Sequence, residues 1–378
     1  MTAPAATRVV VADDSGLMRR VLAHALTDAG FDVVGQAGDG DEALALCRRL
    51  RPDAMTLDLA MPGRDGIGVL RELRRPGAPA IPVIVVSAFS PAHGARAVDA
   101  LSEGAFDLVA KPGAGDALST FVAELADKVR AAAGSVRRRI ARPAVASAPA
   151  PALHAAAPAP PARRAPAAAA AGAKPLVFIA SSTGGPAALA RLVPQLPDRL
   201  GAGTVIVQHM PAGFTTSLAA RLDRASRLHV VEAAAGEALA PGKAVLGPGG
   251  LHLRLDAERR VVLSDAEPIG GLRPRADLGI ADAARLFGRR LLLVVLTGMG
   301  NDGVKGAEAV RAHGGRVLVQ EESTCTVYGM PRAVAEAGLA DGVHGLDDLP
   351  AAIVREVETP PSTAPEGAQP QGGGTRWA

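Results

Sequence analysis

The segment 291–303, LLLVVLTGMGNDG, places a run of apolar residues directly before a glycine-rich turn that contains an acid. Gly298, Gly300 and Gly303 have the G-x-G-x-x-G spacing typical of a dinucleotide-binding turn after a strand. Asp302 lies inside that turn, where its negative charge would repel a pyrophosphate in a partly desolvated pocket. The same glycines suit a buried, ionised carboxylate. We therefore favour Asp302 as an ionised catalytic carboxylate and keep a dinucleotide site as the alternative.

A serine and a histidine occupy comparable positions after two other apolar runs. In PLVFIASSTGGP, Ser182 lies in a glycine-rich turn before a helix expected near Pro186, where free backbone N–H groups favour developing negative charge. In TVIVQHMP, His209 ends the next expected strand. Neighbouring parallel strands lie about 4.8 Å apart, so side chains at their ends can form hydrogen bonds. The pattern predicts a triad in which Ser182 is the nucleophile, His209 moves the proton and Asp302 orients the imidazole.

Each of these residues also has a purely structural interpretation. Ser182 could cap a helix or belong to a phosphate-binding turn, and His209 could be a core histidine. The three positions together favour the triad. Their order in the chain, Ser, His, Asp, differs from the familiar hydrolase orders, and the G-x-S-x-G motif is missing. The sequence therefore disfavours an α/β-hydrolase fold.

A second group of polar residues follows the expected strands near the start of the chain. Its members are Asp13, Asp14, Asp58, Ser87 and Lys111. Functional groups gather at the carboxyl ends of strands in open parallel sheets, so these five residues are expected to converge. Three clustered acids repel one another unless a cation is present, and oxygen ligands suit Mg²⁺. Asp58 would then accept a phosphoryl group, Lys111 would screen its charge, and Ser87 would hydrogen-bond the new oxygens.

The elements that must position these residues follow a repeating βα pattern. Five short apolar runs alternate with helix-like segments in the first part of the chain, which predicts a five-stranded parallel, doubly wound sheet. These runs are 8–13, 31–37, 53–59, 81–88 and 106–112. A second βα series predicts another α/β doubly wound domain with a mostly parallel sheet, with runs at 175–180, 203–209, 290–296 and 315–320. The segment 251–263, LHLRLDAERRVVL, predicts an antiparallel hairpin within it.

Composition divides the chain into two domains, a linker and a tail. From about residue 140 to 173 the sequence contains mainly Ala and Pro with a few Arg, which is typical of an extended linker. A second Pro- and Gly-rich stretch follows Thr359 and ends in GGGTRWA. We expect domains at 1–130 and 174–356, a linker at 131–173 and a disordered tail at 357–378.

The overall composition excludes several classes of protein. Aromatic residues make up only 2% of the chain against 48% hydrophobic residues, so the cores are expected to consist of Val, Leu, Ile and Ala. A net charge of +3 is too small to indicate nucleic-acid binding. Cys47 and Cys325 form no metal-binding spacing. Because the N-terminal segment MTAPAATR has no apolar signal region and no run is long enough for a membrane span, we expect a cytoplasmic protein without membrane insertion.

The first domain resembles response-regulator receiver domains of the flavodoxin-like fold, from residue 8 to about 128. The resemblance rests on VVVADDSGLMRRVL, DAMTLDLAMPGRDGIGVL, IPVIVVSA and GAFDLVAKP. It implies that a partner histidine kinase phosphorylates Asp58 and that Asp13 and Asp14 hold Mg²⁺. The chain departs from the family at Leu108, three positions before Lys111, where an aromatic switch residue is frequent.

The second domain, 174–356, resembles the catalytic domain of the CheB family of chemotaxis protein-glutamate methylesterases. The resemblance rests on ASSTGGP, VQHMPAGFT, PGGLHL, LTGMGNDG and YGMPRAV. The serine before Thr-Gly-Gly is the family's nucleophile, which selects Ser182 over Ser181 and implies that His209 and Asp302 complete the triad. Thr183 and Met299 match residues that line the site, with the Met299 backbone N–H as a candidate oxyanion donor.

Three further residues of this domain bear on the resemblance. In LRPRADLG, Arg275 and Ala276 replace the Ser-Val that the family often has, which could change packing or substrate approach. His252 is expected to belong to the hairpin rather than to be a rival base.

The resemblance implies a hydrolase of glutamate methyl esters on methyl-accepting chemoreceptors that releases methanol and needs no cofactor for the ester step. Family members also deamidate receptor glutamines, an activity that the sequence leaves open. An input domain tethered to a hydrolase suggests that the unphosphorylated receiver covers the active site. Two alternatives remain: an NAD-dependent oxidoreductase that uses the glycines of 298–303, and a non-catalytic adaptor controlled by phosphorylation.

Overall fold

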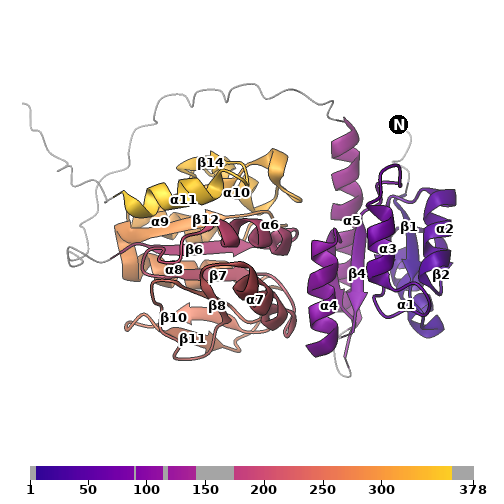
Figure 1. Ribbon diagram of the computed structural model, residues 1–378, viewed down its shortest axis with the longest axis horizontal. Coiled ribbons are helices and arrows are strands. Elements are labelled where there is room, and N and C mark those ends of the chain that lie inside the picture. Colours follow the sequence, from indigo (N-terminus) through magenta and orange to yellow (C-terminus); the bar gives the residue numbers. More distant parts are fainter. Residues whose placement is uncertain (1–5, 89–90, 114–117, 142–173, 360–378) are drawn as a thin grey trace, which may run out of the picture.

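The computed structural model describes residues 6–88, 91–113, 118–141 and 174–359 of the 378-residue chain (Figure 1). Most of the predicted linker and the predicted tail, including the GGGTRWA end, lie outside these described residues. Two α/β domains lie next to each other, each with its own sheet between layers of helices (Figure 1).

The N-terminal domain, which the sequence predicts to be a receiver, contains a five-stranded sheet with the order β2-β1-β3-β4-β5, and all four strand pairings are parallel. The strands are β1 Arg8–Ala12, β2 Asp32–Ala37, β3 Ala54–Leu57, β4 Val83–Ser87 and β5 Asp107–Ala110. The helices are α1 Gly16–Asp28, α2 Gly40–Leu50, α3 Gly66–Leu73, α4 Pro91–Ser102 and α5 Leu118–Ala141. This architecture confirms the predicted doubly wound parallel fold.

Successive side chains of β1 point to opposite faces of the sheet, and both faces are covered by helices. Val10 joins an apolar cluster with residues of α2, α3 and α4, whereas Val9 and Val11 join one with residues of α1 and α5. Side chains that cap helix N-termini fix where the helices begin. Asp39 accepts hydrogen bonds from two backbone N–H groups at the start of α2, and Asp65 accepts one at the start of α3.

Helix α5 extends beyond the predicted end of the receiver domain. It continues to Ala141, so the part of the predicted linker from residue 131 to 141 is helical. The segment is rich in alanine and arginine, which favour helices, and the first proline after it is Pro143. The described helix therefore ends close to residue 140, where the composition changes to mainly Ala and Pro.

The C-terminal domain, which the sequence predicts to be catalytic, contains a seven-stranded sheet with the order β14-β13-β12-β6-β7-β9-β8, and its pairings are all parallel. The strands are β6 Leu176–Ser181, β7 Thr204–Gln208, β8 His229–Glu232, β9 Lys243–Leu246, β12 Leu291–Val295, β13 Arg316–Gln320 and β14 Gly342–His344. A separate antiparallel hairpin consists of β10 His252–Leu255 and β11 Val261–Ser264, as the sequence predicted.

Helices cover both faces of the catalytic sheet, as alternating apolar residues require. They are α6 Gly185–Leu192, α7 Phe214–Ala225, α8 Ala276–Phe287, α9 Val304–Ala312, α10 Met330–Glu336 and α11 Leu349–Glu358, with short 3₁₀ turns η1 Val193–Gln195, η2 Gly288–Arg290 and η3 Glu322–Thr324. Val177 and Ile179 of β6 pack with α6, α7 and α11. Phe178 faces the other side and packs with α8, α9 and α10. The predicted α/β doubly wound domain is confirmed.

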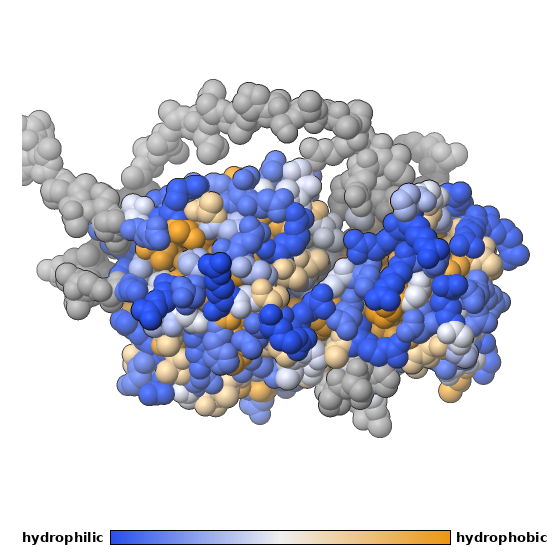
Figure 2. Space-filling view, viewed as in Figure 1, coloured by the Kyte–Doolittle hydropathy of each residue, from blue (hydrophilic) through white to orange (hydrophobic). Residues whose placement is uncertain are grey.

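The two domains are in direct contact through helices. Helix α4 of the receiver packs against α6 and α7 of the catalytic domain (Figure 1). Gly94 permits this approach, because a Cβ there would lie 3.1 Å from the Ser217 Oγ and 3.3 Å from the carbonyl oxygen of Gly213. Hydrophilic residues dominate the face of both domains shown in Figure 2, and hydrophobic residues form only small patches on it.

Within the described part of the chain, no helix combines the length and apolar character that crossing a membrane requires.

Candidate active site and phosphorylation site

Three neighbouring strands of the catalytic sheet direct the predicted triad residues toward one edge. In the order β12-β6-β7, Ser182 directly follows β6, His209 directly follows β7, and Asp302 lies in the turn after β12. Backbone hydrogen bonds fix the chain where it leaves β6 and β7. The Ser182 N–H donates to the carbonyl oxygen of Thr297, and the His209 N–H donates to that of Ser181, each over 3.0 Å. All three residues therefore lie at the carboxyl edge of the sheet, as side chains after parallel strands should.

His209 and Asp302 form a direct pair. The His209 Nε2 lies 2.7 Å from the Asp302 Oδ2, and the two side chains are 7% and 0% exposed. Asp302 is therefore placed to hold the proton on Nε2, which leaves a lone pair on Nδ1. Among the described residues the buried Nδ1 has no hydrogen-bond partner, and no hydrogen bond joins it to the Ser182 hydroxyl. The structure thus brings two triad members into contact and the third to the neighbouring strand end.

Backbone N–H groups hold the carboxylate of Asp302. Oδ2 accepts from Ala276 N over 2.7 Å, and Oδ1 accepts from Asp277 N and Gly303 N, each over 3.0 Å. The first two N–H groups belong to the N-terminus of α8, which favours negative charge. Burial alone would raise the pKa of Asp302, but the hydrogen bond and charge of His209, with these N–H groups, hold that pKa well below its usual value.

A second buried acid and an arginine complete the surroundings of Asp302. Asp277 accepts from the N–H groups of Gly303 and Gly306, and its other oxygen lies 2.8 Å from Arg275 Nη2. Arg275 Nε also lies 3.5 Å from Asp302 Oδ1. Burial and the charge of Asp302 raise the pKa of Asp277. Arg275, which departs from the family pattern, therefore supplies a positive charge beside the buried carboxylates of Asp277 and Asp302.

His252 has a structural role within the hairpin. It is the first residue of β10 and is fully buried. Its Nδ1 accepts from Arg275 N, and its Nε2 lies 3.3 Å from the carbonyl oxygen of Glu267. Both ring nitrogens are therefore engaged by the backbone.

Close packing explains the glycines in the turn after β12 without a bound nucleotide. A Cβ on Gly298 would lie 2.7 Å from the Cβ of Ser182 and would also collide with Met330. Gly300 and Gly303 have φ values of 80° and 99°, which side chains rarely adopt. The glycines thus let the Asp302 turn pack against the Ser182 turn, which favours the carboxylate interpretation over a dinucleotide site.

Of the two predicted substrate-lining residues, Thr183 contacts the receiver domain directly and Met299 packs near the boundary of the two domains. Thr183 is 2% exposed and donates a 2.5 Å hydrogen bond from its hydroxyl to Asp107 Oδ2 at the start of β5. Met299 packs against an apolar cluster made of receiver residues and Val327. The Asp107 carboxylate was not predicted from the sequence, where an acid at a strand start has no distinguishing pattern. The receiver therefore occupies the rim of the catalytic site.

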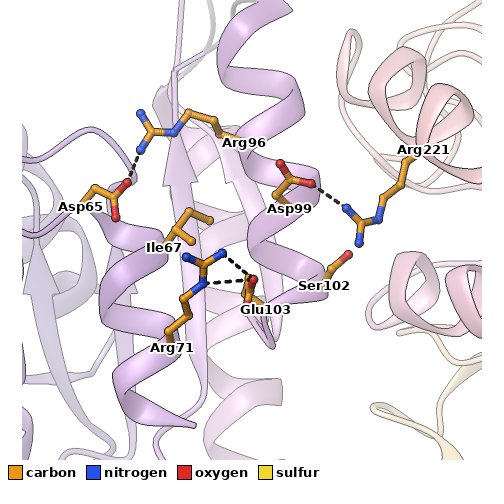
Figure 3. Close-up of a pocket in the computed structure, with 8 residues that line it drawn as sticks. All are labelled: Asp65, Ile67, Arg71, Arg96, Asp99, Ser102, Glu103 and Arg221. Atoms are coloured by element: carbon orange, nitrogen blue, oxygen red, sulfur yellow. Dashed lines mark hydrogen bonds and ion pairs between the residues drawn. The ribbon is translucent and has the colours of Figure 1, made fainter. Parts of the chain in front are cut away.

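A polar cavity of about 400 Å³ lies at the boundary of the two domains (Figure 3). Three ion pairs join its charged residues: Arg96 with Asp65, Arg71 with Glu103, and Arg221 with Asp99. The first two pairs lie within the receiver. Arg221 reaches from α7 to Asp99 on α4, with 2.6 Å between the charged atoms, so this pair links the domains (Figure 3).

The structure brings four of the five predicted phosphorylation-site residues together at the carboxyl edge of the receiver sheet. Lys111 Nζ lies 2.6 Å from Asp58 Oδ2 and 2.7 Å from Asp13 Oδ2. Oxygen atoms of Asp13, Asp14 and Asp58 all lie within 4.8 Å of one another, which fits a site for Mg²⁺. Ser87, the buried fifth residue, ends the neighbouring strand β4.

Charge and burial compete among these groups. Burial raises the pKa of Asp13, against the opposing effect of Lys111. Burial would lower the pKa of Lys111, but hydrogen bonds and charges from Asp13 and Asp58 raise it. The lysine is therefore held charged beside the phosphoryl-acceptor candidate. Leu108, at the family's switch position, is buried in the receiver core.

Comparison with known proteins matches both domains. The family described as response regulator receiver domain matches residues 9–123, and CheB methylesterase matches 177–353. A solved catalytic domain of Thermotoga maritima CheB methylesterase is 42% identical and covers 48% of this chain and 98% of that chain, with a TM-score of 0.48. The response regulator domain of T. maritima CheB is 34% identical and covers 34% and 98%, with a TM-score of 0.31.

Relatives match over nearly the whole length. A protein named protein-glutamate methylesterase/protein-glutamine glutaminase from Symbiobacterium thermophilum is 42% identical, covering 93% of this chain and 97% of its own. One numbered 5 from Myxococcus xanthus is 44% identical, covering 94% and 100%. With both domains matched in the same order, this protein belongs to the CheB family of protein-glutamate methylesterase/protein-glutamine glutaminases that carry a receiver domain.

Proposed function

We propose that this protein hydrolyses γ-methyl esters of glutamate side chains on methyl-accepting chemoreceptors and releases methanol. The names of its relatives support the substrate class. The observation that carries the proposal is the 2.7 Å pair of His209 and Asp302 beside the turn of Ser182. These three residues are the proposed catalytic triad, and the receptor's cytoplasmic helices are the proposed substrate surface.

The first half of the reaction forms an acyl-enzyme. The Ser182 Oγ attacks the ester carbonyl carbon while His209 Nδ1 takes the hydroxyl proton, since Asp302 holds Nε2. The charged imidazole is stabilised by the buried, ionised Asp302. The tetrahedral intermediate then expels the methoxy group, which leaves as methanol with the proton from His209. This step links the glutamyl carbonyl to Ser182.

The second half regenerates the enzyme with water. His209 takes a proton from a water molecule that attacks the acyl carbon, and then returns that proton to the departing Ser182 oxygen. The backbone N–H of Met299 is the proposed oxyanion donor, and Thr183 lines the site. A glutamine side chain could follow the same tetrahedral route and release ammonia, so the proposal includes deamidation, in keeping with the relatives' names.

Regulation by the receiver domain is the second part of the proposal. Asp107 accepts the hydroxyl hydrogen bond of Thr183, the residue after the proposed nucleophile, and Met299 packs against the apolar cluster that Val327 forms with receiver residues. In this closed arrangement a receptor helix cannot use that side of the site. Phosphorylation of Asp58 would favour an open arrangement, because the modified residue directly follows β3, and β3 belongs to the same sheet as β5.

The phosphorylation chemistry rests on the receiver's acidic edge. We propose that a histidine kinase supplies the phosphoryl group and that Asp13, Asp14 and Asp58 hold Mg²⁺ during transfer. The ion would supply charge neutralisation for the incoming phosphoryl oxygens. Lys111 is placed to pair with the same oxygens, and the Ser87 hydroxyl follows at the end of β4.

One experiment tests the catalytic proposal and separates it from its alternatives. Methanol release from methylated receptor fragments is measured with the wild-type chain, Ser182→Ala and Asp58→Asn, each with and without a small phosphodonor and Mg²⁺. We expect release only when Ser182 is present, and stimulation only when Asp58 is present. Equal release by wild type and Ser182→Ala would exclude this esterase and favour the adaptor alternative. Tight NAD binding unaffected by Asp302→Ala would favour the oxidoreductase.

A further inference from the structure

Gln208 is a buried polar residue that the proposed mechanism does not use. It is the last residue of β7, directly before His209, and it is 1% exposed. Its side chain extends from β7 toward the end of β6, where the Ser182 turn begins. A buried amide has two N–H donors and one oxygen acceptor that need hydrogen-bond partners. The partners of Gln208 therefore indicate its structural role.

The three hydrogen bonds of this amide connect the two catalytic segments. Nε2 donates to the carbonyl oxygens of Ser182 and His209, each over 2.9 Å. Oε1 accepts from the hydroxyl of Ser181 over 2.7 Å. Carbonyl oxygens can only accept, so the NH₂ group must face both of them, and the partners fix the orientation of the amide. One side chain thus binds the backbone of both the nucleophile and the base.

The start of α6 is shaped to admit this amide. Gly185 is the first residue of α6, and a Cβ there would overlap the Oε1 of Gln208. Gly185 N also donates to the carbonyl oxygen of Ser182 over 2.7 Å, so that oxygen accepts from both the helix and the amide. The glycine therefore lets the Gln208 side chain enter the turn that carries Ser182.

We propose that Gln208 is a positioning residue that fixes the distance between Ser182 and His209. The inference rests on the proposed esterase function. It assigns Gln208 an effect on the chemical step, since the amide acts through the backbone of the reacting residues. A small displacement of a nucleophile from its base strongly reduces the rate even where substrate binding is intact.

Two substitutions of Gln208 test this role in the full-length protein, activated by Mg²⁺ and a small phosphodonor. Gln208→Glu replaces the donor NH₂ with an oxygen that repels both carbonyl groups, and Gln208→Met keeps the length but removes all three hydrogen bonds. We expect kcat for methanol release to fall about tenfold or more in both variants, with KM changed less than twofold. Ser181→Ala, which removes only the partner of Oε1, should give a smaller fall.

Gln320 provides a comparison for the loss of a buried amide one residue further from the reacting pair. It ends β13, is fully buried, accepts from Thr297 N and donates to the carbonyl oxygen of Thr324. Thr297 in turn accepts the N–H of Ser182, so Gln320 acts on the nucleophile only through Thr297, and its hydrogen bonds do not reach His209. Gln320→Met should lower the melting temperature about as much as Gln208→Met does, with a smaller effect on kcat. An unchanged kcat in Gln208→Met, or a fall no larger than in Gln320→Met, would overturn the inference.

A second readout separates this inference from the esterase proposal. The rate at which a fluorophosphonate modifies Ser182 depends on the activated hydroxyl and needs no receptor substrate. If the wild-type chain modifies rapidly at Ser182 but releases no methanol, the substrate assignment fails while Gln208 can still be tested. Slower modification in Gln208→Met than in Gln320→Met supports positioning, and equal rates contradict it.

Discussion

Thr183 donates a 2.5 Å hydrogen bond to Asp107, a residue 76 positions earlier in the chain and in the other domain. The bond joins the first residue of β5 to the residue that follows the proposed nucleophile. It is buried, and Asp107 also lies 3.5 Å from Lys128 on α5. The receiver therefore contacts the catalytic turn through a charged acceptor held by its own lysine.

Removing this acceptor should activate the unphosphorylated enzyme. A buried hydrogen bond to a charged group contributes about 1.5–3 kcal/mol, so Asp107→Ala should raise the open population about tenfold or more while the open form remains minor. Lys128 keeps Glu124 as a partner, which favours folding of the variant. Methanol release without phosphodonor measures the effect. Asp127→Ala, on the exposed side of α5, is the control, and equal rates in both variants would contradict a closed state held by Asp107.

The ion pair of Arg221 and Asp99 should contribute less to closure. Both side chains are partly exposed, and such pairs contribute about 0.2–1 kcal/mol. Arg221→Glu should therefore raise the basal rate about two- to fivefold at low salt, with a smaller effect at high salt. Adding Asp99→Arg restores the pair with reversed charges and should return the rate toward wild type. A double variant more active than either single variant would exclude this link.

The contact of Asp302 with His209 makes a kinetic prediction. In Asp302→Asn, the amide NH₂ would face the ring nitrogen and favour the wrong tautomer, so kcat should fall about 10³- to 10⁴-fold with little change in KM. Steady-state methanol release at saturating receptor fragment measures it. A loss below tenfold would show that His209 does not depend on this carboxylate.

The same residue predicts an acid-sensitive contribution to stability. The pKa of Asp302 is lowered in the folded protein, relative to about 3.9 in an unfolded chain. Its ionised form therefore stabilises the fold fully above pH about 4, and this contribution is lost as the pH falls from there toward the folded pKa. Calorimetry between pH 7 and pH 3 should find a steeper fall of the catalytic domain's melting temperature below pH 4 in wild type than in Asp302→Asn. Equal slopes would contradict the shift.

Local patterns in the sequence predicted the five receiver strands, the hairpin and four strands of the catalytic sheet, namely β6, β7, β12 and β13. They did not predict β8, β9 and β14, because each of these strands has only three or four residues and no long apolar run around it. Apolar runs followed by polar residues mark the ends of parallel strands, so Ser182, His209 and Asp302 could be placed on one edge without coordinates. The sequence pattern does not show how far α5 extends, because helix formers continue past residue 130 without a break in composition.

Contacts between distant segments could not be predicted in the same way. Asp107 begins a strand like many surface acids, and its partner Thr183 belongs to the other domain. In the sequence, Gln208 is a polar residue near the end of an apolar strand, and only the close approach of β6 gives its amide three partners. Arg275 departs from the family pattern, but its approach to Asp302 depends on how the turn after β12 packs against the start of α8.

Reaction of the full-length protein with a fluorophosphonate, followed by peptide mapping, tests the central claim most directly. In the presence of Mg²⁺ and a small phosphodonor, we expect a single modified serine, Ser182, in the wild-type chain. The rate should fall about 10²-fold or more in His209→Gln, because the base that activates the hydroxyl is lost. Modification at another serine, or an equal rate in both proteins, would contradict the proposed triad.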